Sequence, residues 1–262
     1  MHKGVQLYTI RDYIGDEEQL RTSLLNIKNM GYDCVQMRTP TFMQAKEVKS
    51  FIDSIGLKSL SVSANFEDLL ADPAALIAAV AEAKVYKTDL VAVGTMPESY
   101  RDSEAGFHRY AADANKVALE LYKEGCKLLY HPHALEFFSL GSGTHGMDIL
   151  FSETNPQCVC FSLDTHWLAS GGVNPVEWIY KAKGRMPLVH FKDYAIGPGA
   201  ATIETVVKLF AEVGEGNLDW PNIVAACKKI GVQYVIVEQD YCKGNPFDSL
   251  KISYQNMLKF NV

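Results

Sequence analysis

The chain has 262 residues, of which 48% are hydrophobic and 21% are charged, and its formal net charge is -6. This length suits two small domains or one α/β barrel, which commonly needs about 250 residues. The acidic balance argues against nucleic acid as a partner, because phosphate binding requires a positive surface. We see no signal peptide and no run of about 18 apolar residues, so no membrane association is expected.

The six cysteines form no Cys-x-x-Cys pair, and most of them lie in apolar runs. A thiol in such a run packs as a small hydrophobic group. This pattern favours free thiols in a reducing compartment over a disulfide framework, so a cytoplasmic location is expected.

Short apolar runs rich in β-branched residues alternate with longer segments of helical period. The eight predicted strands are 4–9, 33–38, 57–64, 89–95, 126–133, 158–164, 187–193 and 233–239. The clearest predicted helices are 17–30, 73–86, 105–124, 220–230 and 247–260. Gly31, Gly125 and Gly231 directly follow three of these helices, where glycine is the expected stop.

Alternation of strand and helix predicts a parallel sheet, because parallel strands need a crossover connection. Eight such units predict a single-domain (β/α)8 TIM barrel over residues 1–262. A doubly wound open sheet is the rival, and it usually carries a Gly-rich dinucleotide loop after its first strand. Here the first strand is followed by "TIRDYIGDEEQ", which lacks that motif, so the barrel is favoured.

Titratable residues follow the last four predicted strands, whose carboxyl ends would face the active site of a barrel. They are His131, His133 and Glu136; Asp164 and His166 with Trp167; His190, Lys192 and Asp193; and Glu238 and Asp240. Buried charges need partners, and one divalent ion (Mn²⁺, Zn²⁺, Co²⁺, Fe²⁺ or Mg²⁺) is the simplest partner for these nitrogen and oxygen ligands. Asp193 and Asp240 are expected to orient ligands or to cap helices.

Ordered motifs also resemble a known family. "QLYTIRD" at 6–12, "YHPH" at 130–133, "DTHW" at 164–167, "HFKD" at 190–193, "EVGEGNLDW" at 212–220 and "VEQD" at 237–240 resemble the xylose isomerase-like sugar phosphate isomerase/epimerase family. The resemblance implies a (β/α)8 barrel with one divalent cation held by a Glu, an Asp, a His and a second Glu from strands 5 to 8. By motif, Asp164, His190 and Glu238 fill the last three places.

The first ligand place departs from the epimerases of this family, which carry its Glu within strand 5. Here that stretch reads "LLYHPHALEF", so either Glu136 folds back onto the metal or His133 takes the place, and we favour Glu136. Strand alternation puts His131 and His133 on the same face, so at least one of them is expected to line the site.

The expected chemistry is proton abstraction next to a carbonyl through a metal-stabilised enediolate. Glu238 with Glu136, or a histidine among His131, His133 and His166, would serve as base and acid, and Lys192 would steady an oxyanion. Substrate contacts are expected from the remaining candidates, which are His131, His166, Trp167, Asp193 and Tyr8. The glycines of "GPGAATIETV" at 197–206 suggest a mobile loop over the site.

These observations predict a divalent-metal-dependent isomerase or epimerase that acts on a small sugar or polyol. The alternatives with the same metal chemistry are an inosose-type dehydratase and a lyase or hydrolase of oxidised glycosides. A nuclease of the same barrel type would need three metals, more histidines and a basic groove, and a non-catalytic sugar binder would not need a metal site. Barrels of this size often pair, so a homo-oligomer stays open.

Overall fold

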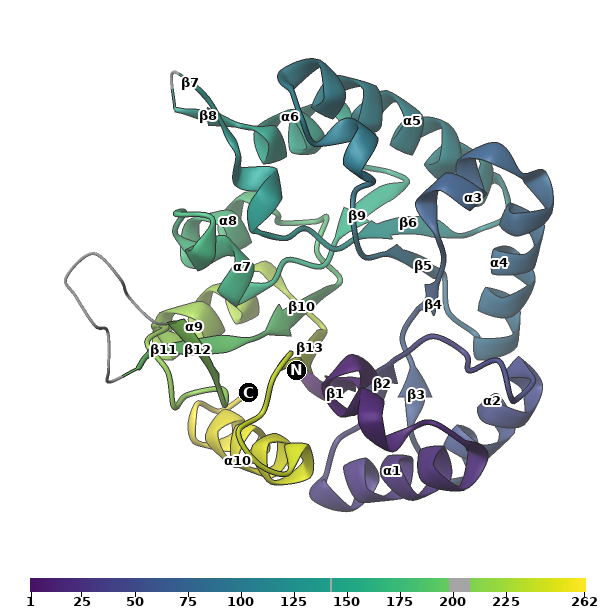
Figure 1. Ribbon diagram of the computed structural model, residues 1–262, viewed down its shortest axis with the longest axis vertical. Coiled ribbons are helices and arrows are strands. Elements are labelled where there is room, and N and C mark those ends of the chain that lie inside the picture. Colours follow the sequence, from purple (N-terminus) through teal and green to yellow (C-terminus); the bar gives the residue numbers. More distant parts are fainter. Residues whose placement is uncertain (142, 198–207) are drawn as a thin grey trace.

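The computed structural model of the protein describes residues 1–141, 143–197 and 208–262. In these ranges eight parallel strands surround one axis, and the helices form a ring outside them (Figure 1). The strands are β1 (His2–Gln6), β2 (Cys34–Gln36), β3 (Lys58–Ser59) continued by β4 (Val62–Ser63), β5 (Leu90–Val93), β6 (Lys127–Tyr130), β9 (Val159–Phe161), β10 (Leu188–Phe191) and β13 (Tyr234–Val237). Each predicted strand is confirmed and is shorter than predicted; β1 begins two residues earlier than the predicted strand 4–9.

Two hydrogen-bonded sheets, in the orders β10-β13-β1-β2-β3 and β4-β5-β6-β9, make up the wall. They join at β3 and β4, which are two parts of one continuous stretch, and at a parallel bridge between Asp164 and His190. At that bridge the His190 N–H donates to the Leu163 carbonyl at 2.8 Å. The sheet therefore closes on itself, and the predicted TIM barrel is confirmed.

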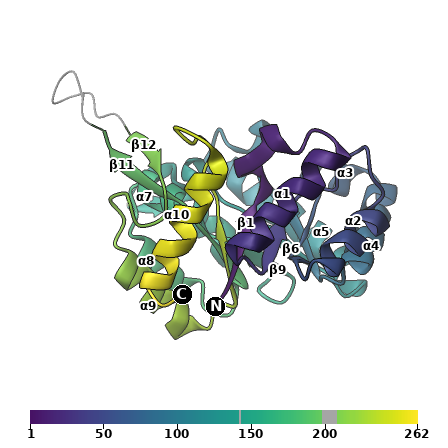
Figure 2. The ribbon, with the colours of Figure 1, turned by 90° about the horizontal axis from the view of Figure 1, so that it is seen from below.

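The outer ring contains all five predicted helices and several shorter ones. Within the described ranges the helices are α1 (Glu17–Met30), α2 (Ala45–Ser54), α3 (Phe66–Ala71), α4 (Pro73–Tyr86), α5 (Glu104–Lys123), α6 (Gly146–Glu153), α7 (Thr165–Ser170), α8 (Pro175–Lys181), α9 (Trp220–Ile230) and α10 (Pro246–Lys259). Gly31 ends α1 at φ 104°, a left-handed backbone that favours glycine. Helices α1 and α10 lie side by side, so the last unit adjoins the first (Figure 2).

Short elements that the sequence did not predict decorate the rim. They are the 3-10 turns η1 (Leu7–Tyr13), η2 (Glu98–Tyr100) and η3 (Ala134–Phe137), the antiparallel pair β7 (Ser139–Gly141) and β8 (Thr144–His145), and the antiparallel pair β11 (Asp193–Ile196) and β12 (Lys208–Ala211). The β11–β12 pair extends away from the barrel (Figure 2). The loop predicted at 197–206 lies, beyond Gly197, outside the described residues.

Inside the barrel, the layer near the start of the strands is apolar. Its buried members are Cys34, Leu60, Leu90, Leu129, Cys160, Leu188 and Ile236. Because side chains alternate along a strand, the residue two positions later points inward again, one layer closer to the carboxyl end. The residues two positions after members of the apolar layer form the next layer. They are Gln36, Ala92, His131, Ser162, His190 and Glu238, so the barrel interior becomes polar at this end.

The described part of the chain contains no helix of the length and hydropathy that a bilayer crossing requires. The cysteines are free thiols, and Cys34 and Cys160 belong to the apolar layer, where they pack as small hydrophobic groups.

Candidate functional site

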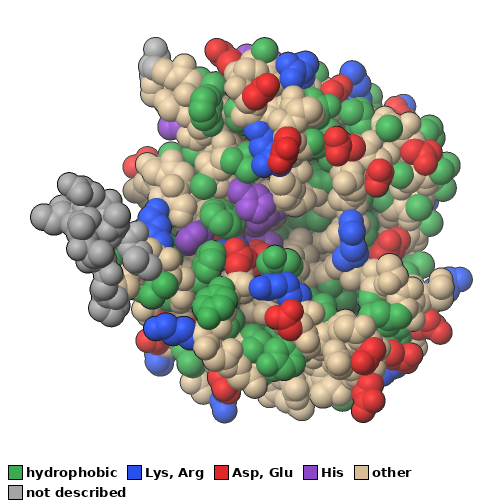
Figure 3. All heavy atoms as spheres, viewed as in Figure 1, with side chains coloured by type: hydrophobic (Ala, Val, Ile, Leu, Met, Phe, Trp, Pro, Cys, Tyr) green, Lys and Arg blue, Asp and Glu red, His purple; other side chains and the backbone are tan. Residues whose placement is uncertain are grey.

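Four buried side chains from four adjacent strands converge at the carboxyl end of the barrel. His131 follows β6, Asp164 follows β9, His190 lies in β10 and Glu238 follows β13. Each offers one ligand atom, and these four atoms lie within 4.8 Å of one another. Figure 3 shows histidine side chains gathered in a central hollow of this face, with acidic side chains beside them. We call this group the four-donor cluster.

His190 has polar partners on both ring nitrogens. Its Nδ1 lies 2.6 Å from Glu238 Oε2, and its Nε2 lies 2.7 Å from Gln36 Oε1. The other end of the Gln36 amide donates from Nε2 to Ser61 Oγ at 3.0 Å. The imidazole is thus held between the acidic end of β13 and the polar end of β2.

Asp164 caps the amino terminus of α7. One carboxylate oxygen, Oδ1, accepts the backbone N–H groups of His166 at 2.8 Å and of Trp167 at 3.0 Å. Its other oxygen, Oδ2, is buried and has no hydrogen-bond partner among the described residues. A buried polar atom in that state costs free energy unless something else satisfies it.

His131 is turned toward the cluster by the backbone. Its Nδ1 donates to the Ser162 carbonyl at 3.1 Å, which leaves Nε2 with a free lone pair. Burial and the neighbouring His190 hold the pKa of His131 well below its usual range, so the ring is neutral. A neutral imidazole with one nitrogen already donating is the form that binds metals.

Lys192 is the buried cation beside the cluster. Its ammonium lies 2.6 Å from Asp240 Oδ1, 3.8 Å from Asp164 Oδ2 and 3.9 Å from Glu238 Oε1. Burial alone would lower the pKa of Lys192, but these carboxylates raise it, so the side chain stays charged. With all three carboxylates ionised, one ammonium leaves two formal negative charges in this group.

The pKa values of the two inward carboxylates, Asp164 and Glu238, are shifted in opposite directions. Burial raises the pKa of Asp164 to about 7 in spite of the nearby Lys192. Burial alone would also raise the pKa of Glu238, but the Lys192 ammonium and the contact with His190 hold it well below its usual range. A cation among these donors would keep Asp164 ionised as well.

A divalent ion fits this donor set. Two imidazole nitrogens and two carboxylates are ligands typical of Zn²⁺, Mn²⁺, Co²⁺ or Fe²⁺, whereas Mg²⁺ prefers oxygen alone. The unpartnered Asp164 Oδ2 and the two uncompensated charges are both satisfied by such an ion. The residues that would hold it are His131, Asp164, His190 and Glu238.

The strand 5 position differs from both sequence expectations. Glu136 is fully buried in η3, where it accepts hydrogen bonds from the Tyr130 hydroxyl and from the His133 backbone N–H, the latter at 2.7 Å. It is therefore turned away from the four-donor cluster, and His131 stands where Glu136 or His133 was predicted as a ligand. His133 packs edge-on against the His131 ring at 4.8 Å and lines the cleft beside it.

Asp193, which was expected to contact the substrate, is buried and hydrogen-bonded to a different part of the chain. Its carboxylate is fully buried and accepts five hydrogen bonds, at 2.5 to 3.4 Å, from the segment ahead of α9 and from its own neighbour. The donors are the backbone N–H groups of Tyr194, Gly214, Gly216 and Leu218 and the Trp220 indole. Asp193 therefore holds the chain between β12 and α9 in place.

The remaining predicted contacts surround the site at different depths. The Trp167 ring lies 4.8 Å from the Lys192 ammonium and packs against His133. His166 is buried behind it, where its Nε2 contacts Ser170 Oγ at 3.2 Å. Tyr8 is exposed on the rim, with the Arg11 guanidinium 4.5 Å from its ring centre. Tyr8 lines the cleft, whereas Trp167 and His166 support its wall.

Sequence reasoning missed Gln36, which the structure places against His190. A signal was present, because Gln36 lies within the predicted strand 33–38, two positions after the inward Cys34. The same alternation that links Leu188 to His190 links Cys34 to Gln36.

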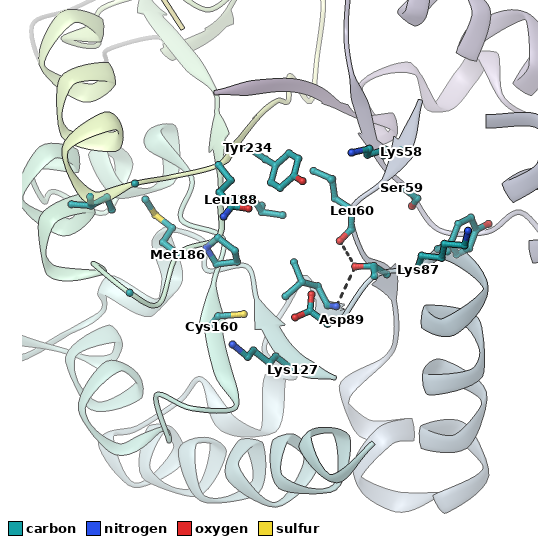
Figure 4. Close-up of a pocket in the computed structure, with 18 of the residues that line it drawn as sticks. Lys58, Ser59, Leu60, Lys87, Asp89, Lys127, Cys160, Met186, Leu188 and Tyr234 are labelled. Atoms are coloured by element: carbon teal, nitrogen blue, oxygen red, sulfur yellow. Dashed lines mark hydrogen bonds between the residues drawn. The ribbon is translucent and has the colours of Figure 1, made fainter. Parts of the chain in front are cut away.

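An open cleft of about 620 Å³ gives access to this end of the barrel. His131, His133, His190, Lys192 and Glu238 border one side of it, and the other side is bordered by Met37, Arg38, Ser63, Ala64, Ala92, Val93, Gly94 and Thr95. A cavity of about 680 Å³ lies at the opposite end, where the strands begin (Figure 4). Lysines and an aspartate surround its apolar floor there, but it contains none of the four-donor cluster. The labelled residues include Lys58, Lys127 and Asp89 around Leu60, Cys160 and Leu188.

The chain resembles curated proteins over somewhat more than half of its length and solved structures over almost all of it. It is 29% identical over 165 residues to an inosose dehydratase of Clostridium botulinum, a match that covers 57% of this chain and 53% of that protein. The chain thus spans about half the length of this curated relative. A sugar phosphate isomerase/epimerase from Parabacteroides distasonis shares the fold, with a TM-score of 0.78, 21% identity, and coverage of 98% of this chain and 93% of that one.

A third similarity is to the IOLI protein, whose crystal structure contains a bound zinc atom. That structure has a TM-score of 0.70 and 16% identity, and the match covers 99% of this chain and 98% of that one. The family model described as xylose isomerase-like TIM barrel matches residues 24–256. The chain belongs to the xylose isomerase-like TIM barrel family.

Proposed function

We propose that this protein is a divalent-metal-dependent enzyme that removes a proton next to a carbonyl group of a sugar or polyol. The observation that carries the proposal is the four-donor cluster, with its unpartnered Asp164 Oδ2 and its two uncompensated negative charges. His131, Asp164, His190 and Glu238 would hold the ion. When bound, a divalent ion acts as a Lewis acid that polarises the carbonyl and so acidifies the neighbouring C–H.

The proton would be taken by a group that lines the cleft without being a ligand. His133 meets this condition, and its Nδ1 has no hydrogen-bond partner among the described residues. Burial lowers the pKa of His133 to about 4, so the ring is neutral at physiological pH and is able to accept a proton. Lys192 lines the same cleft as a buried positive charge, and it would stabilise negative charge that develops on a substrate oxygen there.

Among reactions that begin this way, the site favours elimination of water, that is, a dehydratase. Among the described residues that line the cleft, every imidazole and carboxylate comes from β6, β10 and β13 or the residues that follow them. The facing side carries Arg38, Ser63, Ala64, Ala92, Val93, Gly94 and Thr95, which include no imidazole and no carboxylate. Epimerisation requires proton transfer on both faces of one carbon. A syn elimination requires it on one side only: His133 would take the C–H proton, the double bond would form, and the same proton would pass to the neighbouring hydroxyl, which leaves as water.

The relative named inosose dehydratase supports this choice. Isomerisation within the same family is the second candidate, because a single base on one side is also sufficient to move a proton between adjacent carbons. Both candidates depend on the same metal and the same proton abstraction.

The test begins with metal content, measured by plasma mass spectrometry on protein purified without chelator. We expect about one divalent ion per chain. The loaded protein is then incubated in D₂O with an inosose and with a panel of ketoses, followed by NMR and ultraviolet absorption. Loss of water with a new conjugated carbonyl supports the dehydratase, and deuterium in a recovered or isomerised sugar supports the isomerase. A protein that takes up neither Mn²⁺, Co²⁺ nor Zn²⁺ would overturn the proposal.

A further inference from the structure

Gln36 reaches His190 from another part of the barrel wall. It ends β2, is 3% exposed, and contributes Oε1 at 2.7 Å from His190 Nε2. An amide oxygen only accepts, so this contact places a proton on Nε2 of the imidazole. The proton on Nε2 leaves Nδ1 with its lone pair, unless the ring carries a second proton.

That lone pair faces Glu238 Oε2 at 2.6 Å. A lone pair and a carboxylate oxygen repel each other at this distance unless a proton or a cation stands between them. With the Gln36 amide turned over, its NH₂ would donate to Nε2, and the proton would move to Nδ1 to bond Glu238. The orientation of one amide thus selects between a His190 that offers Nδ1 as a ligand and a His190 that does not.

We propose that Gln36 is a positioning residue that prepares His190 to bind the divalent ion by holding the proton on Nε2. This inference rests on the proposed function. Outer partners of this kind fix the tautomer of a ligating histidine, and their loss typically lowers metal affinity 10- to 100-fold.

The anchor of the amide is Ser61, in the short stretch between β3 and β4. Gln36 Nε2 donates to Ser61 Oγ at 3.0 Å, and Ser61 is 1% exposed. The hydroxyl occupies the NH₂ end of the amide and so keeps the carbonyl end directed at His190. Ser61 therefore affects His190 only through Gln36 and does not contact it directly.

Gln36 is a side-chain partner, so mutation is able to remove it. His131 is oriented by the Ser162 backbone carbonyl, and Asp164 is oriented by the backbone N–H groups that follow it. Backbone groups persist in every variant. A substitution at position 36 therefore changes the support of one ligand and leaves the support of the other two in place.

The experiment is a Co²⁺ titration of metal-free protein, followed by calorimetry and by the visible absorption of the bound ion. Gln36→Met keeps the length of the side chain and removes its polar end, and we expect a 10- to 100-fold weaker affinity with an altered cobalt spectrum. Gln36→Glu keeps an acceptor at Nε2, so its affinity should stay within about threefold of wild type. Ser61→Ala should lie between them, and Gln255→Met, an exposed glutamine of α10, is the matched control.

The possible outcomes separate the two proposals. Wild-type protein that binds no Co²⁺ would overturn the proposed function, and the role of Gln36 with it. Wild type that binds Co²⁺ while Gln36→Met binds it equally well, with the same spectrum, would overturn the role of Gln36 alone. A Gln36→Glu variant that is folded and binds as weakly as Gln36→Met would also overturn it, because an acceptor would then be irrelevant.

Discussion

The two sides of the barrel rim are built by the same rule and carry different chemistry. In β6, β10 and β13, the inward residue two positions after the apolar layer is His131, His190 or Glu238, whereas in β5 it is Ala92. Beyond these positions, Lys192 and Asp240 follow on one side and Gly94 follows on the other. We call the first side the titratable wall and the second, formed by Ala64, Ala92, Val93 and Gly94, the uncharged wall. The exposed Arg38, after β2, lines the cleft beyond the uncharged wall.

The difference between the two walls assigns them different roles: one carries out the reaction and the other makes room for the substrate. The titratable wall concentrates the donors and the fixed charge that a metal-assisted proton transfer requires. The uncharged wall offers small and apolar side chains, and a Cβ added at Gly94 would meet no atom within 4 Å. That side therefore has room for the part of the substrate that does not react. Mutations on each wall test these two roles, and the largest effect on turnover is expected for the metal ligands.

Removing a ligand should abolish the function of the titratable wall. For His190→Ala we expect the metal content to fall from about one to below about 0.1 per chain and turnover to fall by about 10³-fold or more, because the Lewis acid is lost. Metal analysis and product NMR are the measurements. His108→Ala, at an exposed histidine that contacts Glu153 on the outer surface, should retain both properties. Retention of metal and turnover by His190→Ala would place the chemistry elsewhere.

Removing the buried cation tests the charge balance of the same wall. Lys192→Met leaves Asp164, Glu238 and Asp240 without their ammonium, so we expect about 100-fold lower turnover and a loss of about 3 kcal/mol of unfolding free energy in metal-free protein. Added Mn²⁺ should restore part of the lost stability, as followed by urea unfolding. Lys181→Met is the control, because that lysine pairs with Asp148 at the surface. An equal loss of stability in both variants would contradict this account of Lys192.

A bulkier uncharged wall should change binding rather than chemistry. We expect Gly94→Leu to raise KM about tenfold, with kcat changed less than about twofold, because the added side chain takes space from the ground state and the transition state alike. Co²⁺ affinity and Tm should match wild type, since the backbone there does not need glycine. A large fall in kcat at unchanged KM would mean that the reacting carbons lie against this wall.

Glu136 offers a test outside both walls. Burial raises the pKa of Glu136 from 4.5 to about 7, so the folded state holds this proton more tightly than the unfolded state. The unfolding free energy should therefore fall as the pH rises from about 4.5 to 7, by roughly 1–3 kcal/mol from this group. Glu136→Gln should flatten that slope in urea titrations and leave Co²⁺ affinity unchanged. Weaker Co²⁺ binding by this variant would indicate that Glu136 takes part in metal binding after all.

Much of this arrangement was predictable from the pattern of residues. The alternation of strands and helices predicted the barrel, and α1, α4 and α9 occupy the predicted ranges residue for residue. The carboxyl ends of parallel strands share one rim, so Asp164, His190 and Glu238 were expected close together, and they are. These predictions hold because strand and helix periods are local properties of the sequence.

The strand 5 ligand position was not predictable in the same way. Residues 130–136 offer His131, His133 and Glu136 within reach of one another, and spacing alone does not choose among them. The fold decides because η3 turns Glu136 back onto the Tyr130 hydroxyl and the His133 N–H, while the Ser162 carbonyl orients His131 inward. The Gln36–His190 contact spans 154 residues of sequence, and Asp193 accepts from the Trp220 indole 27 residues away.

The sequence by itself determined the barrel and the side of the rim that carries titratable groups, because both follow from periodicity along single elements. The tertiary structure alone decided which of those groups face one another and which are occupied by structural hydrogen bonds. The physical reason is that a buried polar atom takes the nearest satisfying partner in space, and that partner is set by packing between elements that the sequence keeps far apart.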